Sequence, residues 1–521
     1  MRIFRSLFCI TCFLVFSGVF AQVQYKIEIR DVSTEEPVSF ATIRFDGSNR
    51  GLIADYNGQF RLPFITAEDI SFLVITSIGY QELKVEINSL LKNELNILRM
   101  QSQTEALDAV ILNSKKPRVF LNEVKKNKKL LASDIVRKAV YAIPVNLDDK
   151  PHSYIGYYRD YQIIDELYFN LNEGILEQYD GGIYSNKVQD SVNQSVFYSF
   201  KTNRNFNVDE YYTKAYNEVT KYIQNADILP YGGNELTLLN VHDAIRNYDI
   251  SSFSFVYKIT RDFLFNHEFV KGDVRFIDDE PVINIIIESK KGKVSYAHTA
   301  YGVISISLED FSIHNFSYTV YDFNKLNPLF NIETEYRRQD GAMYLNYITF
   351  NNRFVITDGK IFQESNVIYN REQNRFYVNF DTDLDVKTVQ RRDFKIRYND
   401  KRIFIQKLEI LNPQRISLQV ADFDDSLKEL TFEEMDGFTF NIRNISDING
   451  RVIYEPQKKL GYQFREFFVQ EVIPRKIQDE SLKVIPKNSG LMSAPINENT
   501  EMDVYIINSP LMQRRMKKDK N

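Results

Sequence analysis

The segment AYGVISISLEDFSIHNFSYTVYD, residues 300–322, decides the fold class of this chain. It contains two runs of strand-forming residues that are joined by a tight turn at Glu309-Asp310. The neighbouring segments repeat this pattern, with turns at Asp279-Glu280 and Asp340-Gly341. Successive strands joined by short turns form an antiparallel meander. Such a sheet curves, and we expect its concave face to be a place for a ligand.

The composition supports a mainly β chain and limits the partners. Aromatic residues make up 14%, with 39 Phe, 32 Tyr and no Trp, and aromatic residues favour strands. The 521 residues indicate about three domains of roughly 150 residues each. The chain has 65 basic and 70 acidic residues, a net charge of -5. This balance argues against a nucleic-acid partner, which would need a basic surface.

The first residues, MRIFRSLFCITCFLVFSGVFAQ, predict a secretory signal peptide over residues 1–21. Their apolar core is shorter than the roughly 20 residues that a membrane-spanning helix needs. We therefore expect a mature protein that begins at Gln22 and is exported, to the periplasm or to an association with the outer membrane. Both cysteines, Cys9 and Cys12, lie in the signal, so thiol catalysis and disulfides are excluded for the mature chain.

Residues 22–112 contain short strand-sized runs separated by turn residues, which is typical of a β-sandwich. In GLIADYNGQFRLP, residues 51–63, the alternation breaks at Asp55-Tyr56-Asn57-Gly58 and resumes at Phe60. Asn57-Gly58 supplies the positive φ that a tight hairpin requires. We expect residues 22–112 to fold on their own, because their strands pair locally.

Three blocks of this first unit carry a family resemblance: TEEPVSFATI, GLIADYNGQF and ITSIGYQ. In this order they resemble the carboxypeptidase regulatory-like domain, which opens many secreted and outer-membrane proteins of the Bacteroidota. The glycine usual in the first strand of that family is absent from YKIEIRD. The resemblance implies a transthyretin-like sandwich that assists folding or docking and has no catalytic residues of its own.

The rest of the chain divides by composition into three parts. Residues 113–131 are rich in lysine and predict a basic linker. Residues 132–474 predict a large β-rich envelope domain, a half-barrel-like meander with a few helices. One helix is expected from Ser133 or Asp134 to Ile143, and a second over residues 237–248. Residues 475–521 are polar and predict a disordered tail.

The large domain also resembles envelope proteins that follow the same regulatory-like domain. The similarity rests on the pairing of DEPVINIIIES with YGVISISLEDFSIHNFSY, and ASDIVRKAVYAIPVN, YIGYYRD, LNEGILEQYD and REFFVQEV fit it too. Its meander is similar in outline to the half-barrels that carry lipoproteins to the outer membrane. This is a resemblance of shape, and it identifies no reaction.

The residues that could carry chemistry do not form a recognisable motif. A peptidase zinc site needs histidines and a carboxylate at close spacing, and none of the five histidines has that spacing. Ser48 lacks the nucleophile-elbow spacing, and Ser89 and Lys92 form an isolated Ser-x-x-Lys match. DTDLDV, residues 381–386, lacks the turn glycine of a calcium loop. We therefore predict no catalytic residues, no metal site and no cofactor. The histidines are His152, His242, His267, His298 and His314.

Two functions remain as hypotheses. The first is a non-enzymatic cell-envelope protein that binds or scaffolds at the periplasmic side of the outer membrane, with an envelope protein or an apolar ligand as partner. The alternative is a secreted, peptidase-like hydrolase whose active site is dispersed over the large domain. The absence of a local metal or nucleophile motif favours binding.

Overall fold

The computed structural model describes most of the chain and divides it into two units. The first comprises residues up to Thr213, Asn225–Arg353 and the residues from Tyr462 onward, and the second comprises Lys214–Gln224 and Phe354–Gly461. The predicted signal peptide and residues 113–123 of the predicted linker lie outside the described residues. The described ranges are 24–46, 51–63, 71–77, 80–102, 124–214, 216, 220–223, 233–251, 258–277, 280–293, 298–322, 328–370, 372–421 and 437–511.

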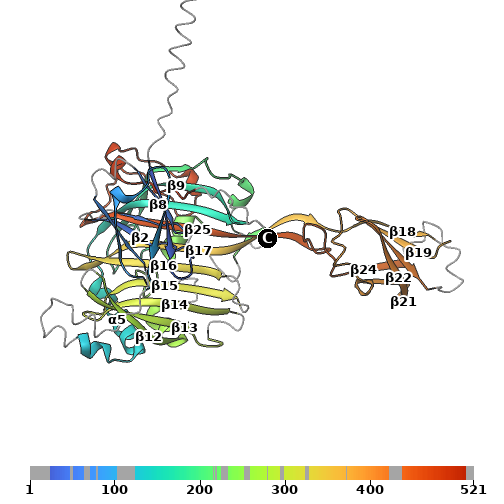
Figure 1. Ribbon diagram of the computed structural model, residues 1–521, viewed down its shortest axis with the longest axis horizontal. Coiled ribbons are helices and arrows are strands. Elements are labelled where there is room, and N and C mark those ends of the chain that lie inside the picture. The colour runs from blue at the N-terminus through green and yellow to red at the C-terminus, as the bar shows by residue number, and fades with distance from the viewer. Residues whose placement is uncertain are drawn as a thin grey trace, which may run out of the picture. The chain divides into compact units, whose positions relative to one another are not determined.

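The first unit begins with a β-sandwich of two small sheets (Figure 1). One sheet has the order β4-β1-β7, in which β1 is antiparallel to β4 and parallel to β7. The other has the order β3-β2-β5-β6. The apolar residues between the two sheets form a core of their own. The strands are β1 (Gln24–Asp31), β2 (Thr42–Phe45), β3 (Gly51–Ile53), β4 (Gln59–Pro63), β5 (Phe72–Thr76), β6 (Leu83–Glu86) and β7 (Leu95–Met100).

The turn at Gly58 differs from the predicted hairpin. Gly58 has φ +69°, as the sequence predicts, and its amide donates to the carbonyl of Asp55 at 2.9 Å. However, β3 pairs with β2 and β4 pairs with β1, so the two strands beside the turn belong to different sheets. The turn therefore connects the two layers of the sandwich, and the hairpin prediction is wrong.

A large antiparallel sheet forms the body of the first unit, in the order β10-β9-β8-β25-β17-β16-β15-β14-β13-β12. β11 pairs with β17 at Val355 and Ile356, in the part of β17 that belongs to the second unit. The run from β12 to β17 is the predicted meander, and the mainly β prediction is confirmed. Its strands are β8 (His152–Ile164), β9 (Leu167–Asp180), β10 (Ser195–Thr202), β11 (Lys221–Tyr222), β12 (His267–Ile277), β13 (Glu280–Ser289), β14 (His298–Ser307), β15 (Ile313–Asp322), β16 (Pro328–Gln339), β17 (Ala342–Ile361) and β25 (Pro456–Pro474).

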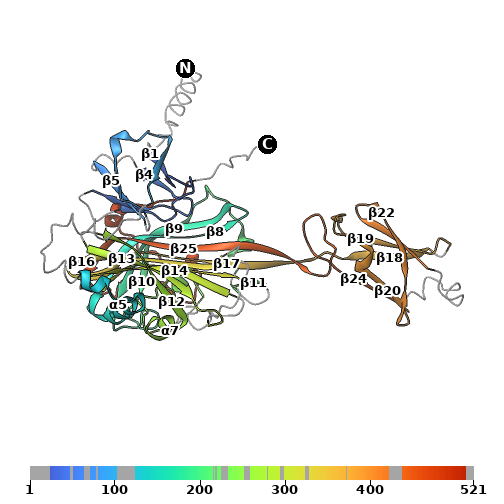
Figure 2. The same ribbon diagram turned by 60° about the horizontal axis from the view of Figure 1, so that its bottom comes forward.

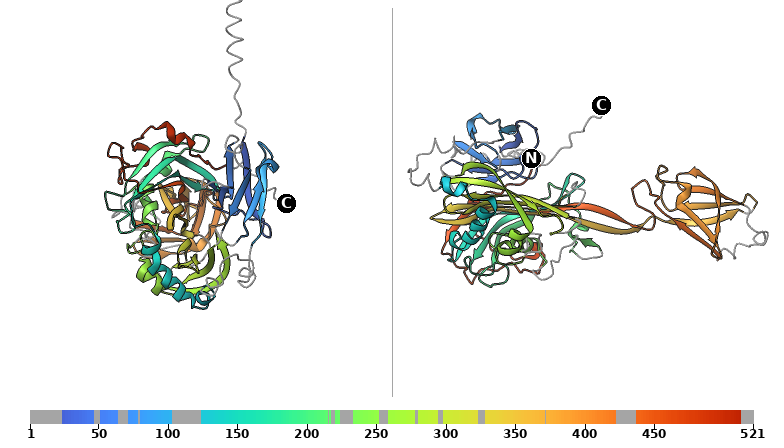
Figure 3. Two further views of the ribbon diagram at one scale, coloured as in Figure 1. Left: turned by 90° about the vertical axis from the view of Figure 1, so that its left-hand side faces the viewer. Right: turned by 90° about the horizontal axis from the view of Figure 1, so that it is seen from below.

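One face of this sheet carries the main core. Phe316, Tyr318 and Val320 alternate along β15 and are fully buried, because alternate residues of a strand point to one face. The sheet curves, as the left view of Figure 3 shows, and its own helices α5 and α7 lie against this face (Figure 2). The face that was expected to hold a ligand is thus covered, in its described part, by side chains of the same chain.

The helices only partly follow the sequence. α5 (Ala132–Asn146) buries the predicted face of Ile135, Val136, Ala139, Val140 and Ile143. It continues through Pro144, near its last turn, where the missing N–H removes a single helical hydrogen bond. α6 (Glu235–Val241) is capped by Asn234, whose side chain accepts from the amide of Thr237, and it ends earlier than predicted. Further helical turns before the second unit are η1 (Ile87–Ser89), η2 (Glu210–Thr213), η4 (Ile259–Phe263) and α7 (Leu264–Asn266). No helix in the described ranges is long and apolar enough to cross a membrane.

Residues 475–511 differ from the predicted disordered tail, because they pack on the sheet. The amide of Ile485 donates to the carbonyl of Ser195 at 2.8 Å, and that of Asn497 donates to Phe197 at 2.8 Å. Both partners lie on β10, so this segment follows the outer edge of the sheet. Ile485, Leu491, Ile506 and Leu511 of this segment are buried, whereas others such as Ile477 and Val504 are exposed. It contains η8 (Leu491–Ser493) and η9 (Thr500–Val504).

The second unit is an insertion in the large sheet, and this differs from the single domain expected over residues 132–474. The chain enters it within β17 and leaves it within β25. It consists of two sheets, β18-β19-β23-β22 and β21-β20-β24, around a separate apolar core. Its elements are β18 (Glu364–Asn370), β19 (Arg375–Phe380), η5 (Arg391–Asp393), β20 (Phe394–Tyr398), β21 (Lys401–Ile403), β22 (Ile405–Asn412), β23 (Arg415–Val420) and β24 (Phe438–Ile442).

Candidate functional site

Two β-bulges mark the most distinctive polar site of the first unit. Between β16 and β17, Glu335 pairs with Tyr347 and Tyr336 pairs with Leu345, which leaves Asn346 as an extra residue. Between β25 and β8, Val469 pairs with Gly156 and Glu471 with Ile155, which leaves Gln470 as an extra residue. β17 and β25 are neighbours in the sheet. Bulges of this kind redirect side chains and are common beside functional sites.

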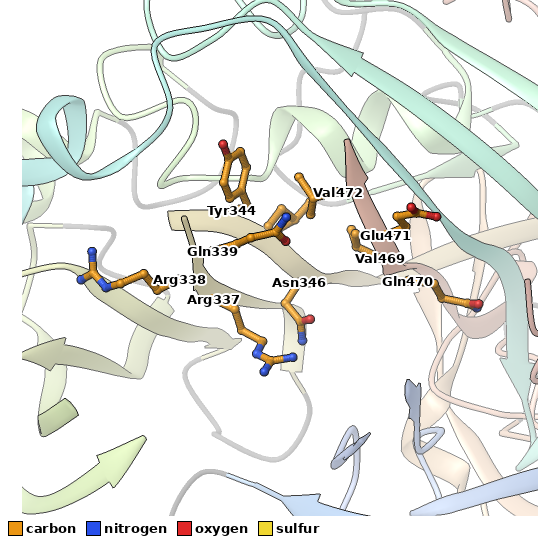
Figure 4. A pocket seen from close by; sticks show the side chains of 10 residues that line it. Arg337, Arg338, Gln339, Tyr344, Asn346, Val469, Gln470, Glu471 and Val472 are labelled. Atoms are coloured by element: carbon orange, nitrogen blue, oxygen red, sulfur yellow. The ribbon is translucent and has the colours of Figure 1, made fainter. Parts of the chain in front are cut away.

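A cleft with a volume of about 330 Å³ lies at these bulges, between the end of β16, the start of β17 and the end of β25 (Figure 4). Both bulge residues, Asn346 and Gln470, line it. Seven of the ten lining side chains carry polar groups, which makes the cleft suited to hydrogen bonding. The lining residues are Arg337, Arg338, Gln339, Tyr344, Leu345, Asn346, Val469, Gln470, Glu471 and Val472.

Hydrogen bonds to other segments hold the two bulge amides in place. Asn346 Nδ2 donates to Glu335 Oε1 at 2.8 Å, and Glu335 Oε2 accepts from the hydroxyl of Thr42 in the sandwich at 3.0 Å. Gln470 Nε2 donates to the carbonyl of Ile506 at 2.7 Å, and Gln470 Oε1 accepts from the Ile506 amide at 2.8 Å. The sandwich and the C-terminal segment therefore both reach the border of the cleft.

A charged cluster fixes one end of the cleft. Arg338 Nε donates to Glu280 Oε1 at 2.5 Å, and Arg338 Nη2 donates to Asp310 Oδ2 at 2.6 Å. His314 Nε2 lies 3.0 Å from Glu280 Oε2. Burial alone would raise the pKa of Glu280, but the hydrogen bonds from His314 and Arg338 lower it to about 2. Glu280 is therefore ionised near neutral pH and holds Arg338 at the rim.

Tyr344 forms another part of the wall. Its hydroxyl donates to Asp148 Oδ2 at 2.5 Å. Burial, and then the bond to the Asp148 carboxylate, raise the pKa of Tyr344 above its usual value, so it stays protonated and acts as a hydrogen-bond donor. The cleft thus presents amides, guanidinium groups and a phenol, which bind polar ligands such as a polypeptide segment. This lining does not favour the apolar ligand that the sequence suggested.

Next to the cleft, the face of the sheet opposite the helices carries a buried ion pair. Arg159 on β8 donates to Glu466 Oε2 on β25 through Nε at 2.8 Å and Nη2 at 2.5 Å. Both side chains are at most 2% exposed. Tyr161 donates to Glu466 Oε1 at 2.6 Å, and Arg159 Nη1 donates to the carbonyl of Asn508 at 2.8 Å. Such a pair must be fully satisfied by partners, because an unpaired buried charge is costly.

The sandwich contacts the sheet through the turn that the sequence singled out. Asn57 Nδ2 donates to the hydroxyl of Tyr168 on β9 at 2.8 Å. Asp55 is fully buried, and burial raises its pKa to about 6 although Arg159 and two backbone amides oppose the shift. Asn508 Nδ2 donates to the carbonyl of Ile53 at 2.7 Å. The first domain is thus attached to the sheet through both its own turn and the C-terminal segment.

The five histidines lie apart from one another and are involved in local structure. His152 contacts the Lys150 carbonyl and the Tyr154 hydroxyl, and His267 contacts the Phe263 carbonyl. Burial lowers the pKa of His242 to about 3 and that of His267 to about 4. His298 lies at the start of β14, and His314 belongs to the rim cluster. In the described ranges, no three His, Cys, Asp or Glu residues are grouped so as to hold a metal ion.

The other residues weighed from the sequence have structural roles or lie outside the described ranges. The Ser89 hydroxyl donates to the carbonyl of Glu86 at 2.7 Å. Asp385, in the loop resembling a calcium site, accepts from the amide of Lys387 at 3.1 Å. Ser48 and the turn at residues 278–279 are not described.

Sequence reasoning did not find the bulges, although a weak signal exists. Residues on one face of a regular strand recur every second position. Leu345 and Ile348 both belong to the main core, and Val469 and Val472 both pack in it, so each pair is spaced by three. A three-residue spacing inside a strand indicates an inserted residue, which is Asn346 in β17 and Gln470 in β25.

Comparison with known proteins identifies only the first domain. Residues 28–112 match the family model of the CarboxypepD_reg-like domain, which confirms the resemblance of the N-terminal sandwich. No curated protein matches the chain. A chain in the complex structure of Pseudomonas aeruginosa MucA/MucB aligns over 56% of this chain and 94% of its own length, with 8% identity and a TM-score of 0.16. A similarity at that TM-score supports no inference about fold or function.

Proposed function

We propose that this protein is a non-enzymatic scaffold of the cell envelope that binds a partner protein at the periplasmic side of the outer membrane. The cleft at the two bulges is its binding site, and the partner contributes a polar, extended segment. The sandwich is the structural module that stabilises one border of this site. Export and location rest on the signal-like first residues, and the binding role rests on the cleft.

The observation that carries the proposal is the pair of bulge amides. Asn346 and Gln470 are each an extra residue in a strand, and each is held by hydrogen bonds from a different segment of the chain. A bulge interrupts regular strand pairing and redirects a side chain. Two bulges beside one cleft therefore support a functional role for the cleft. Both atoms of the Gln470 amide are engaged by Ile506, so Gln470 shapes the site, and Asn346 is the bulge amide that can bond a polypeptide backbone. Preorganised groups of this kind lower the entropic cost of binding.

Charge at the rim adds selectivity to this site. Arg338 is shared between Glu280 and Asp310, so its charge is already balanced within the protein. Glu471 accepts a hydrogen bond from Tyr505 of the C-terminal segment. A neutral or weakly charged polar segment therefore fits the cleft better than a strongly charged one, because it does not disrupt these pairs.

Site-specific photo-crosslinking tests the proposal. A photoreactive side chain is placed at Gln339, on the wall of the cleft, in the full-length protein made by its own bacterium. The matched control carries the same group at Lys201, an exposed residue of β10. We expect one discrete adduct with an envelope protein from position 339 and none from position 201.

The adduct from position 339 should also weaken at least fivefold when Asn346 is replaced by alanine, because this removes a binding amide. Equal adducts from both positions, no adduct from position 339, or an adduct indifferent to Asn346→Ala would contradict the cleft as the binding site. Circular dichroism of each variant establishes that the fold is intact.

A further inference from the structure

The outer strand of one sheet in the second unit has features of an interaction edge. β22 ends the order β18-β19-β23-β22, and no described strand pairs with its other side. An open strand edge is a template for pairing with another strand. Large apolar side chains lie at or beside it: Phe404 is 65% exposed, Leu411 49% and Ile410 39%.

The sequence of β22, IQKLEILN, is complementary in charge to itself. In an antiparallel pair of two copies centred on Leu408, Lys407 of each copy lies opposite Glu409 of the other. Opposite charges directly across such a pair stabilise it, and like charges destabilise it.

The backbone geometry of β22 is compatible with this register. Its pairing with β23 is regular from Lys407 to Ile410, and register shifts occur only on either side of this stretch. Lys407 and Glu409 are two residues apart, so their backbone groups point to the same edge. In this register, the backbone N–H and C=O groups of Lys407 in one copy and Glu409 in the other are therefore matched for antiparallel pairing.

The existing contacts of these residues can be kept or exchanged. Glu409 already pairs with Lys407 of its own strand at 2.5 Å and with Arg375 of β19. In a two-copy edge, it also meets the second Lys407, which forms an alternating ladder of charges. Arg391 Nη1 donates to the carbonyl of Gln406 at 2.9 Å, an exposed contact that a partner strand would replace.

We propose that β22 binds β22 of a second copy of this chain, forming a two-fold antiparallel edge that joins the two four-stranded sheets. The charge pattern favours a second copy over an unrelated strand, because a second copy forms two opposite-charge pairs, each between Lys407 of one chain and Glu409 of the other. The proposal concerns the second unit alone and does not depend on the cleft or its partner.

Sedimentation velocity of the full-length mature chain tests the proposal. We expect a reversible monomer–dimer equilibrium at micromolar concentrations. Lys407→Glu and Glu409→Lys, made separately, should each raise the dissociation constant of the dimer at least tenfold, because each places two like-charge pairs across the edge. The double variant Lys407→Glu/Glu409→Lys should dimerise like the native chain, since the charges are exchanged and remain complementary.

Mixing the two single variants gives a control against misfolding. The Lys407→Glu chain then places two acids opposite two lysines of the Glu409→Lys chain, so we expect a heterodimer where neither variant self-associates. A native chain that stays monomeric at 100 micromolar, or charge variants that dimerise as well as the native chain, would overturn the proposal. Failure of the heterodimer to form would also overturn it.

A disulfide measurement fixes the register. In a chain with Cys9 and Cys12 replaced by serine, Leu408→Cys should crosslink to itself under mild oxidation, because position 408 lies opposite its own copy. Gln406→Cys is the matched control and should not crosslink, since its copies lie four residues out of register. Equal crosslinking from both positions would contradict the proposed register and leave a different strand pairing as the explanation.

Discussion

At the residue scale, the sequence predicted the conformation of Gly58 but not its surroundings. The Asn57-Gly58 dipeptide signals a positive φ, and φ is +69°. The sequence could not show that Gly58 connects two sheets or that Asp55 beside it is fully buried. The surroundings of Asp55 include Arg159 and Asn508, which lie far away in the sequence and are brought there by the fold.

Substitution of Gly58 tests this turn. A Cβ at this position would lie 2.6 Å from the carbonyl oxygen of Ile29, and the positive φ adds strain for any β-branched residue. We expect Gly58→Val to lower the free energy of unfolding by at least about 1–2 kcal/mol, measured by urea denaturation. Gly490→Ala, where a Cβ meets nothing within 4 Å, is the control and should change stability little. A Gly58→Val variant with the same free energy of unfolding as the native protein would contradict the positive φ and the close contact at this turn.

Asp55 should give the protein a pH-dependent stability. Because burial raises its pKa from 3.8 to about 6, the unfolded chain releases the Asp55 proton before the folded chain does. The folded state therefore loses up to about 3 kcal/mol relative to the unfolded state as the pH rises from about 4 to about 6. Asp55→Asn keeps an oxygen that can accept from the amides of Asn57 and Gln59, but it has no proton to release.

Urea denaturation of both proteins at pH 4, 5, 6 and 7 checks this. The stability of Asp55→Asn relative to the native protein should increase between pH 4 and pH 6 and then level off. A difference that stays constant over this range, or that decreases with rising pH, would contradict a raised pKa.

At the scale of elements, the spacing of apolar residues and turn residues predicted the regular helices and strands. The buried face of α5 follows from the helical spacing of its apolar residues, and the meander follows from short turns. The tail was misread because residues 475–511 make their contacts through backbone hydrogen bonds and a few separated apolar residues, which leave no periodic signal. The bulges were missed because an inserted residue interrupts the very alternation that identifies a strand.

The C-terminal segment should stabilise the N-terminal sandwich. Ile506 belongs to the core of the sandwich, and Arg61 Nη2 donates to the carbonyl of Pro510 at 3.0 Å. Deleting residues 505–521 should lower the stability of the sandwich by about 3 kcal/mol or more, since it exposes apolar surface and leaves buried polar groups without partners. Amide hydrogen exchange of β1 and β4 measures this loss.

A chain that ends after Leu511 is the matched control and should exchange like the full-length protein. The isolated sandwich, residues 22–112, is predicted from its sequence to fold alone, and without Ile506 we expect it to be less stable than in the whole chain. If deletion of residues 505–521 leaves exchange in β1 and β4 unchanged, the segment does not contribute to this core.

At the scale of the whole molecule, composition predicted a mainly β protein and gave no boundary for the insertion. The second unit is built from the same residue types as the large sheet, so nothing in composition separates them. Its independence comes from its own core, which contains Val378, whereas Ile285 belongs to the core of the first unit. Separate cores unfold as separate cooperative units unless a large interface couples them.

Calorimetry of the full-length protein should therefore show a transition of the second unit that is separate from the transition of the large sheet. Val378→Ala should lower the melting temperature of only one, and Ile285→Ala should lower only the other, because each side chain is fully buried and its truncation costs about 2–4 kcal/mol in its own core. A single transition that both variants shift equally would contradict the division into two units.

The central claim is that this chain binds and does not catalyse, and a turnover assay with metal analysis on the purified mature protein tests it most directly. The protein is assayed against pooled peptide, ester and glycan substrates, beside Glu471→Gln and single alanine variants of His242, His267, His298 and His314. We predict no turnover above the buffer and no stoichiometric metal. Stoichiometric zinc would contradict the predicted absence of a metal, and turnover that one of these substitutions abolishes would identify a hydrolase.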